Sequence, residues 1–504
     1  MPIDSQPQDY ATVISEFEND FGVEDWKYGS IHIWPIIRIA LTTEWLKAAD
    51  DRRGPNSPRN RAKILSAIYV RLKAVAYSLP SVIPLFATGF NANRLAQGNV
   101  GIFTNDISRE KAGGAYYQRF FDTLIDLQVI DATKALNFEH ISHGKHPPFR
   151  PRINTTGAEL LAILFGSVLN EFGFLSLSSC VPFSEITNWC VLRGLPCHSV
   201  TSKRIARAYA SLLVLSRLYL WIIHAFKLTS AIKVCWYGLD GMALALACSR
   251  AEIPCIDLQH GVAGAGHHRA YSNWTKFPST GYSLMPTSFW CWSRLDEQSL
   301  RACFDAHGIN VDTKVIGNLW AKLAKKRGHS PWYKNLFCLD GKVKNWADNG
   351  SEVILVTLQG ENLPVMIRDA LMLSPANWHW AIRVHPRFAT NLSVLKSLEE
   401  ATQRYSFVDI KCSSASSLYP LLSAVKVHVT EWSAVYYDAD LFGVKTVFVS
   451  PKSLQLFGEV IDSGAALYAD TPEKLIAALR QIVRNSHSIH AVNIPFLPAT
   501  DMAY

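Results

Sequence analysis

Two polar turns between Lys233 and Gly266 carry the residue types best suited to chemistry in this chain. The apolar run Val234–Tyr237 predicts a strand that ends in the turn containing Asp240, and Pro254–Leu258 predicts a second strand that ends at His260. Between them, a run of small apolar residues predicts a helix that packs closely on a sheet. In open α/β sheets ligands bind outside the carboxyl ends of the strands, so both turns should face one crevice. A carboxylate or an imidazole at such an edge can serve as a general base, which makes Asp240 and His260 the candidate catalytic residues.

Further polar residues of this half follow predicted strands or the same turn. The run NVGIFT at Asn99–Thr104 predicts a short buried strand, after which Asp106 stands at the same kind of edge. Three histidines could suggest a metal site, but no set of acidic ligands accompanies them, so no metal is expected. Each of these side chains can also be an ordinary loop residue without a ligand. The candidate residues on this side are Asp106, Gln259, His267 and His268.

The second half of the chain repeats the pattern of strands that end in polar turns, here with residues suited to phosphate. A glycine after a strand lets the backbone approach a phosphate, and arginines are bidentate phosphate donors. A serine turn leads a helix, whose free N–H groups attract anions, and an acid follows on that helix. The alternatives are an ordinary turn glycine, a structural histidine and a solvated helix acid. The candidate residues are Gln359, Gly360, Arg383, His385, Arg387, Ser433 and Asp438.

Strands that alternate with helices in both halves predict the elements that hold these turns. Such alternation is typical of parallel sheets, so we expect an α/β fold with two Rossmann-like domains facing a cleft. A polar, basic stretch after Leu319 separates the halves. The expected organisation is a helical N-terminal extension (1–95), an N-terminal Rossmann-like domain (96–325) and a C-terminal Rossmann-like domain (326–504).

Composition indicates a folded chain with a large core. It has 504 residues, 49% of them hydrophobic and 18% charged, with a formal net charge of +8. The ten cysteines show no C-x-x-C pair, and the N-terminus lacks the pattern of a signal peptide, so we expect a cytoplasmic protein with reduced thiols.

Two segments have a composition that could suit contact with a membrane. Ala210–Phe226 is expected to be a buried or an interfacial helix, and Arg61–Leu79 is either a surface helix or a basic amphipathic patch at a membrane.

The order of these motifs resembles that of the GT-B glycosyltransferases. IPCIDLQHGVAG is similar to the acceptor-side turn of the transferase that completes the lipid-linked peptidoglycan precursor, and KVIGNLW is similar to the hinge turn of that class. TEWSAVYYDADLFGVKTVFVS resembles the nucleotide-sugar segment, in which Asp438 stands where an acid binds the ribose. The run Arg383–Arg387 resembles the His-Pro motif of sialyl-, Kdo- and teichoic-acid transferases, in which the histidine contacts donor phosphate.

The resemblance implies a function that composition alone does not. It implies transfer of a sugar from a nucleotide-sugar to a lipid-linked or glycan acceptor in bacterial surface-polysaccharide (capsule or O-antigen) synthesis, at the inner face of the cytoplasmic membrane. No cofactor besides the donor and no nucleic-acid partner are expected. Two alternatives stay open: an enzyme of the UDP-sugar 2-epimerase type, and a non-catalytic assembly protein that keeps only the fold.

Overall fold

The computed structural model divides the chain into two compact units, unit 1 (Met1–Trp320) and unit 2 (Ala321–Tyr504), which are described separately. The division falls close to the expected boundary after residue 325. The structure describes residues 10–51, 82–90, 98–112, 114–141, 147–172, 175–261, 270–327, 339, 341–385, 388 and 391–489.

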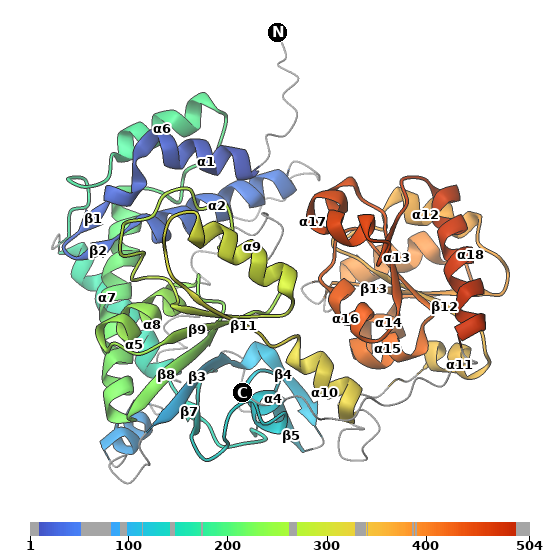
Figure 1. The fold of residues 1–504 in the computed structure, drawn as a ribbon, viewed down its shortest axis with the longest axis horizontal. Coiled ribbons are helices and arrows are strands. Elements are labelled where there is room, and N and C mark those ends of the chain that lie inside the picture. Colours follow the sequence, from blue (N-terminus) through green and yellow to red (C-terminus); the bar gives the residue numbers. More distant parts are fainter. Residues whose placement is uncertain are drawn as a thin grey trace. The chain divides into compact units, whose positions relative to one another are not determined.

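Unit 1 is built on a seven-stranded sheet in which every neighbouring pair of strands is parallel (Figure 1). Its order is β11-β10-β9-β8-β3-β6-β7. From β3 the chain runs to β6 and β7 on one side, and then returns to place β8 on the other. The order therefore reverses between β3 and β8, and such switch points are where open α/β sheets bind ligands. The strands are β3 (Asn99–Asn105), β6 (Ala135–His140), β7 (Ile153–Asn154), β8 (Leu228–Val234), β9 (Cys255–Leu258), β10 (Ser288–Cys291) and β11 (Asp312–Val315).

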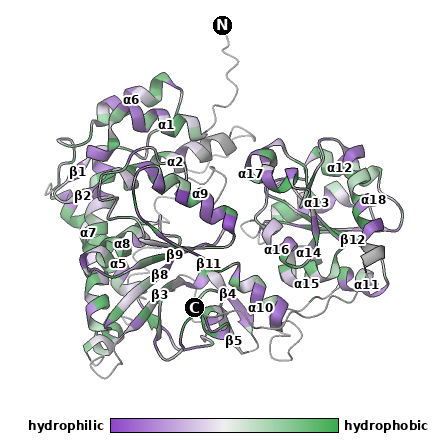
Figure 2. Ribbon diagram, in the orientation of Figure 1, coloured by the Kyte–Doolittle hydropathy of each residue, from purple (hydrophilic) through white to green (hydrophobic). Residues whose placement is uncertain are grey.

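Helix α7 packs against both α5 and α8, and the three helices form much of the core of unit 1. Helices α5 and α7 can approach closely because Gly166 has no side chain: a Cβ at this position would lie 2.4 Å from the backbone of Ser211. The helix α7 is long and apolar enough to cross a membrane, but half of its most apolar window is buried inside the protein. It contains most of the segment Ala210–Phe226, and Figure 2 shows it among other hydrophobic ribbons. The helices and the hairpin that follow the N-terminal segment in this unit are α4 (Phe121–Asp126), α5 (Thr156–Glu171), α6 (Phe183–Leu192), α7 (Ser202–Ala225), α8 (Leu239–Arg250), α9 (Arg294–Asp305), β4 (Arg109–Ala112) and β5 (Ala115–Gln118). Helix α10 (Leu319–Arg327) begins at the end of unit 1 and lies mainly in unit 2.

The N-terminal segment is part of unit 1 and shares its core. Helices α1 (Tyr10–Phe21) and α2 (Trp34–Asp51) flank a two-stranded hairpin, β1 (Lys27–Tyr28) and β2 (Ile31–His32). Phe17 stacks on Trp34 at a centroid distance of 5.3 Å. The predicted amphipathic segment Arg61–Leu79 lies outside the described residues.

A buried ion pair ties this segment to the rest of unit 1. Arg38 Nε donates to Glu18 Oε1 at 2.8 Å, and both side chains are completely buried. Glu18 Oε2 accepts from the backbone N–H and the hydroxyl of Thr275, at 2.5 and 2.7 Å. Arg38 also donates to the carbonyl of Asn273 at 2.6 Å and lies over the ring of Trp274. Buried hydrogen bonds of the two charged side chains thereby join residues that are more than 230 positions apart in the sequence.

Unit 2 repeats the same strand order on a smaller scale. Its six parallel strands have the order β14-β13-β12-β15-β16-β17, which reverses between β12 and β15. The strands are β12 (Glu352–Thr357), β13 (Trp378–Arg383), β14 (Val408–Asp409), β15 (Val427–Thr430), β16 (Lys445–Phe448) and β17 (Leu467–Tyr468). The helices are α11 (Lys342–Asp348), α12 (Val365–Met372), α13 (Leu392–Thr402), α14 (Lys411–Ala415), α15 (Leu418–Ala424), α16 (Val435–Leu441), α17 (Pro451–Asp462) and α18 (Pro472–Ile489).

The centre of this second sheet contains a fully buried histidine. His428 on β15 is hydrogen-bonded to the hydroxyls of Thr357 and Thr446, on the strands to either side, at 2.8 and 3.0 Å. Burial lowers the pKa of His428 to about 3, so the ring is neutral and structural.

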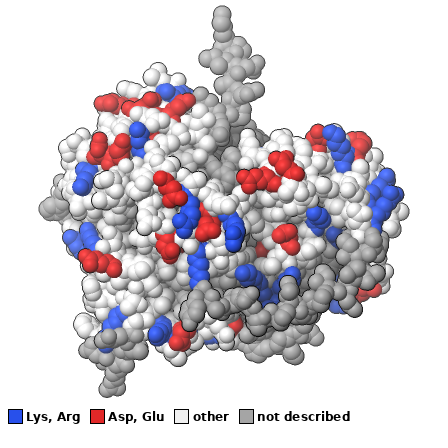
Figure 3. Space-filling model, in the orientation of Figure 1, with Lys and Arg blue, Asp and Glu red and all other residues white. Residues whose placement is uncertain are grey.

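The two parallel sheets confirm the expected α/β fold class with two Rossmann-like domains. One strand lies earlier than predicted: the run Val234–Tyr237 is not a strand, because β8 ends at Val234. Cys235 adopts a left-handed backbone conformation (φ 67°), which ends the strand. Lys233 is thereby a buried residue within β8 and not a residue ahead of the strand. On the face shown in Figure 3, acidic and basic side chains are interspersed over the described surface of each unit.

Replacing Glu18 by Gln or Arg38 by Met should destabilise unit 1 by about 3–5 kcal/mol, because each change leaves a buried charge without its partner. Urea unfolding followed by tryptophan fluorescence measures this loss. The matched control is Lys203→Ala, which removes an ion pair to Glu171 from a lysine whose side chain is 69% exposed. It should cost no more than about 1 kcal/mol. Equal losses in the three variants would show that the buried pair does not anchor the N-terminal segment.

Candidate active site

The switch point of unit 1 places Asp240 beside a buried lysine. Lys233 Nζ lies 2.5 Å from Asp240 Oδ2, and the lysine side chain is 8% exposed whereas that of Asp240 is 44% exposed. Burial opposes the charge on both groups, but each charge stabilises the other, so the pKa of Asp240 is lowered and that of Lys233 is raised. Asp240 is therefore a firmly ionised carboxylate at the surface of the edge.

The position of Asp240 depends on a glycine in the first turn of α8. A Cβ on Gly241 would lie 2.2 Å from the carbonyl oxygen of Trp236, so only glycine allows α8 to approach the end of β8 this closely. This contact holds the start of α8 over the strand, and Lys233 can then reach Asp240.

His260 follows β9 and contacts a tyrosine from the neighbouring turn. Its Nε2 lies 3.2 Å from the hydroxyl of Tyr237, and the two rings are close to parallel. Burial lowers the pKa of His260 to about 4, so its imidazole is neutral at physiological pH. The ring can orient a ligand through hydrogen bonds, but it is a weak base.

Strand β9 also contains a buried carboxyl group that the sequence did not single out. Asp257 on β9 accepts from the backbone N–H of Trp236 at 3.0 Å and from the hydroxyl of Tyr271 at 2.7 Å. Burial raises the pKa of Asp257 to about 7, although these hydrogen bonds favour the charged form. The group connects β9 to the turn after β8 and to Tyr271.

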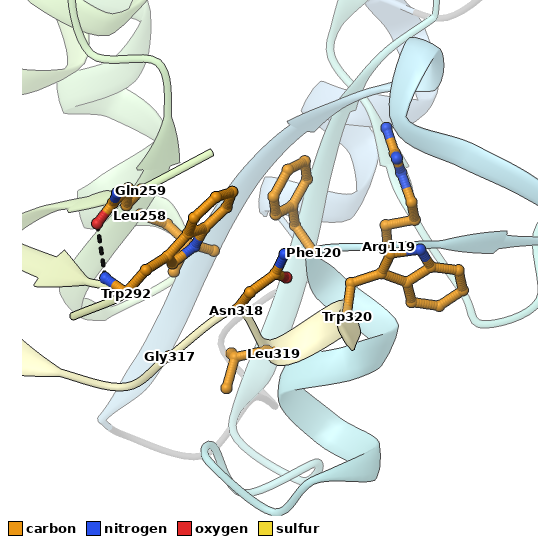
Figure 4. Close-up of a pocket in the computed structure, with 9 residues that line it drawn as sticks. All are labelled: Arg119, Phe120, Leu258, Gln259, Trp292, Gly317, Asn318, Leu319 and Trp320. Carbon is orange, nitrogen blue, oxygen red and sulfur yellow. Dashed lines mark hydrogen bonds between the residues drawn. The ribbon is translucent and has the colours of Figure 1, made fainter. Parts of the chain in front are cut away.

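Gln259 acts as a clamp between neighbouring turns. Its amide nitrogen donates to the carbonyl of Gly261 at 2.7 Å, and its amide oxygen accepts from the backbone N–H of Trp292 at 2.6 Å. Figure 4 shows the second of these bonds at the rim of a recess with an empty volume of about 260 Å³, part of it open to solvent. The recess follows the carboxyl ends of β9, β10 and β11, and Phe120, Trp292 and Trp320 supply its aromatic walls. Gln259 shapes this wall through the backbone of Trp292.

Asp106 lies directly after β3, on the other side of the switch point from Asp240. It begins a 3-10 turn, Asp106–Ser108, and is only 8% exposed. The structure therefore brings Asp106, Asp240, Gln259 and His260 to the carboxyl edge of one sheet. His267 and His268 lie outside the described residues.

The same edge holds a histidine that sequence reasoning missed. His140, the last residue of β6, has its Nδ1 2.6 Å from Glu159 Oε2 on α5. Glu159 Oε1 accepts from the hydroxyl of Tyr219 on α7, at 3.1 Å. No local pattern marks His140, because its partner Glu159 is a helix acid that only the packing of α5 brings near.

In unit 2 the switch point lies between the ends of β12 and β15, which pair through Thr357 and Thr430. Gln359 and Gly360 follow β12, and the turn containing Ser433 follows β15, so the two predicted turns are neighbours. The Ser433 hydroxyl accepts from the N–H of Val435 at 3.2 Å. Helix α16 has seven residues, so a phosphate at this turn would be held by local N–H groups more than by a helix dipole. Asp438 lies on this helix and is 7% exposed.

The remaining predicted residues of unit 2 belong to the end of β13. Arg383 Nη1 donates to the carbonyls of Ser413 (2.7 Å) and Ser416, so its guanidinium holds the turn around α14. His385 is partly exposed and its ring lies near that of Phe388. Arg387 lies outside the described residues. Among the described residues, no three His, Cys, Asp or Glu side chains gather as ligands for a metal ion.

Asp257→Asn should remove a pH dependence of stability. The folded-state pKa near 7 is above the ordinary value of 3.8, so the folded protein holds this proton more tightly. Its contribution to stability is complete below about pH 4 and is lost as pH rises toward 7, at up to about 1.4 kcal/mol per pH unit. Urea midpoints at pH 5 and pH 7 measure the effect. The loss from pH 5 to pH 7 should be smaller in the variant, and an unchanged difference between the two midpoints would contradict the assignment.

Comparison with known proteins gives structural similarities only. No protein-family model and no curated protein matches the sequence. The chain is similar to the UDP-GlcNAc 2-epimerase of Neisseria meningitidis bound to UDP-GlcNAc (12% identity, TM-score 0.42, covering 77% of this chain and 92% of that one). It is also similar to a UGT transferase of Siraitia grosvenorii in complex with UDP (11%, 0.41, 76% and 90%). A third match is the glycosyltransferase SnogD of Streptomyces nogalater (12%, 0.34, 78% and 94%). With such identities and TM-scores, these similarities assign neither an activity nor a site residue to this chain.

Proposed function

We propose that the chain is an enzyme that uses a nucleotide-sugar, and specifically a glycosyltransferase of bacterial surface-polysaccharide synthesis. It transfers the sugar to a lipid-linked or glycan acceptor, in the cytoplasm and at the inner face of the cytoplasmic membrane. No cofactor besides the donor takes part.

The observation that carries the proposal is the strand order of the two sheets. Numbered along the chain, both sheets have the order 3-2-1-4-5-6, with a seventh strand in unit 1. This is the order of dinucleotide-binding sheets, which bind at the switch point. In each unit the residues singled out from the sequence stand at that point: Asp106 and Asp240 in unit 1, and Gln359 and Ser433 in unit 2.

The chemistry of the two edges differs in the way that glycosyl transfer requires. The edge in unit 2 offers a glycine, a serine, a histidine and the helix acid Asp438, which suit a phosphate and a ribose. The edge in unit 1 offers a charged carboxylate and two imidazoles, the residue types from which a general base for an acceptor hydroxyl can come. A donor side and a proton-transfer side are both needed to move a sugar.

Asp438→Asn should weaken donor binding about 10- to 100-fold, because an amide replaces a charged acceptor for the ribose hydroxyls. The measurement is thermal shift and titration calorimetry with a panel of UDP-, GDP- and CMP-sugars. The matched control is Asp440→Asn, an exposed acid two residues further along the same helix, which should leave the affinity unchanged. Equal affinities for wild type and Asp438→Asn would contradict the donor site.

The same panel separates the alternatives. Nucleotide release that depends on added bacterial lipid extract supports the transferase. Epimerisation of a UDP-sugar without any acceptor would indicate the epimerase-type enzyme instead of the transferase. If the wild-type protein binds no member of the panel, a non-catalytic assembly protein would be indicated.

A further inference from the structure

Two of the groups that could accept a proton at the edge of unit 1 are poorly suited to it. Asp240 is paired with the buried ammonium of Lys233 at 2.5 Å, so protonating it would leave that ammonium without its counter-ion. His260 lies close to Tyr237, and burial disfavours its charged form. A base changes its charge when it takes a proton: Asp240 would lose its negative charge and His260 would gain a positive one, and the surroundings of each group resist that change.

The pair formed by His140 and Glu159 is built for the opposite effect. The carboxylate of Glu159 is 2.6 Å from Nδ1 of the imidazole, and its residue is 6% exposed. Tyr219, 1% exposed, donates to the other carboxylate oxygen and so fixes the plane of the group. A buried carboxylate held in this way fixes the tautomer with the proton on Nδ1 and stabilises the imidazolium that forms when Nε2 takes a second proton.

His140 is also accessible and close to the switch point. Its side chain is 32% exposed, and it pairs with Asn105 at the end of β3, directly before Asp106. The charged groups that act on it come from three elements: Glu159 on α5, Asp240 on α8 and Lys233 on β8. Burial and Lys233 oppose a charge on the imidazole, but the two carboxylates outweigh them, so the pKa of His140 is raised.

We propose that His140, oriented by Glu159, is the general base that takes the proton from the acceptor hydroxyl, an inference that rests on the proposed transferase function. Glu159 and Tyr219 are positioning residues, since they act through the imidazole. Asp240 then serves as a fixed negative charge near the base.

The proposed step moves the sugar of a nucleotide-sugar to an acceptor hydroxyl. The O–H bond of the acceptor breaks and its proton moves to Nε2 of His140. The oxygen forms a bond to the anomeric carbon of the sugar, whose bond to the phosphate oxygen breaks, and the electron pair leaves with the nucleotide. The imidazolium later returns its proton to solvent.

The test is the pH profile of nucleotide release from the nucleotide-sugar that binds best in the panel, with bacterial lipid extract as the source of acceptor. His140→Gln should lower the rate about 10²- to 10⁴-fold while donor affinity stays unchanged. In the wild type the rate should rise with pH through a midpoint above 6.5, since the base works only when neutral. Glu159→Gln should move that midpoint to lower pH, a shift that a merely structural defect would not produce. Added imidazole should partly restore the rate of His140→Ala.

The matched control is His198→Gln. His198 also has its Nδ1 near a glutamate, 2.8 Å from Glu44, but its side chain is 84% exposed and belongs to the connection between α6 and α7. This variant should keep the wild-type rate and midpoint.

The outcomes separate this inference from the proposed function. If the wild type releases nucleotide and His140→Gln does so at a similar rate with the same midpoint, the base assignment is overturned and the transferase stands. If the wild type neither binds nor consumes any nucleotide-sugar, both fall. Histidine NMR tests the dyad without any substrate, because the resonance that is absent from the spectrum of His140→Gln is that of His140. It should titrate above pH 6.5 in the wild type, and a value below 6.5 would overturn the dyad.

Discussion

The buried ammonium of Lys233 decides how the carboxyl edge of unit 1 can be used. A lysine at the end of a central strand is tolerated only with a counter-ion, and Asp240 is that counter-ion. The requirement places the first turn of α8 directly over the end of β8, and Gly241 is the residue that allows this approach. Asp240, a candidate base by the sequence, is therefore first a structural partner of Lys233.

The two units show how one strand order supports different chemistry. Both sheets reverse at a central pair of strands, so each has the kind of switch point at which open α/β sheets bind ligands. In unit 1 the residues around that edge include ionisable groups whose pKa values are moved in opposite directions by burial and by neighbouring charges. The edge of unit 2 offers Gly360 and Ser433 beside the helix acid Asp438, and the buried histidine of its sheet, His428, is neutral within the core.

Much of the first unit depends on contacts between distant parts of the chain. The pair of Glu18 and Arg38 joins α1 and α2 to the loop around Thr275, and α7 carries Tyr219 to the carboxylate that orients His140. A helix that could pass for a membrane span by its composition is thereby a support of the candidate site. Helix packing, more than any local motif, brings these side chains together.

The sequence by itself determined the α/β alternation, the presence of two Rossmann-like sheets and the position of most polar turns, because strand periodicity and turn residues are local signals. It placed Asp240, His260, Gln359 and Ser433 after strands, and they lie there, Asp240 in the first turn of α8. Only the tertiary structure decided which of these groups are engaged elsewhere: Gln259 as a clamp, Arg383 as a brace and Asp240 as a counter-ion. It also paired His140 with Glu159. Those roles depend on how deeply a side chain is buried and on which distant elements supply its partners. The spacing of residues along one stretch of chain determines neither.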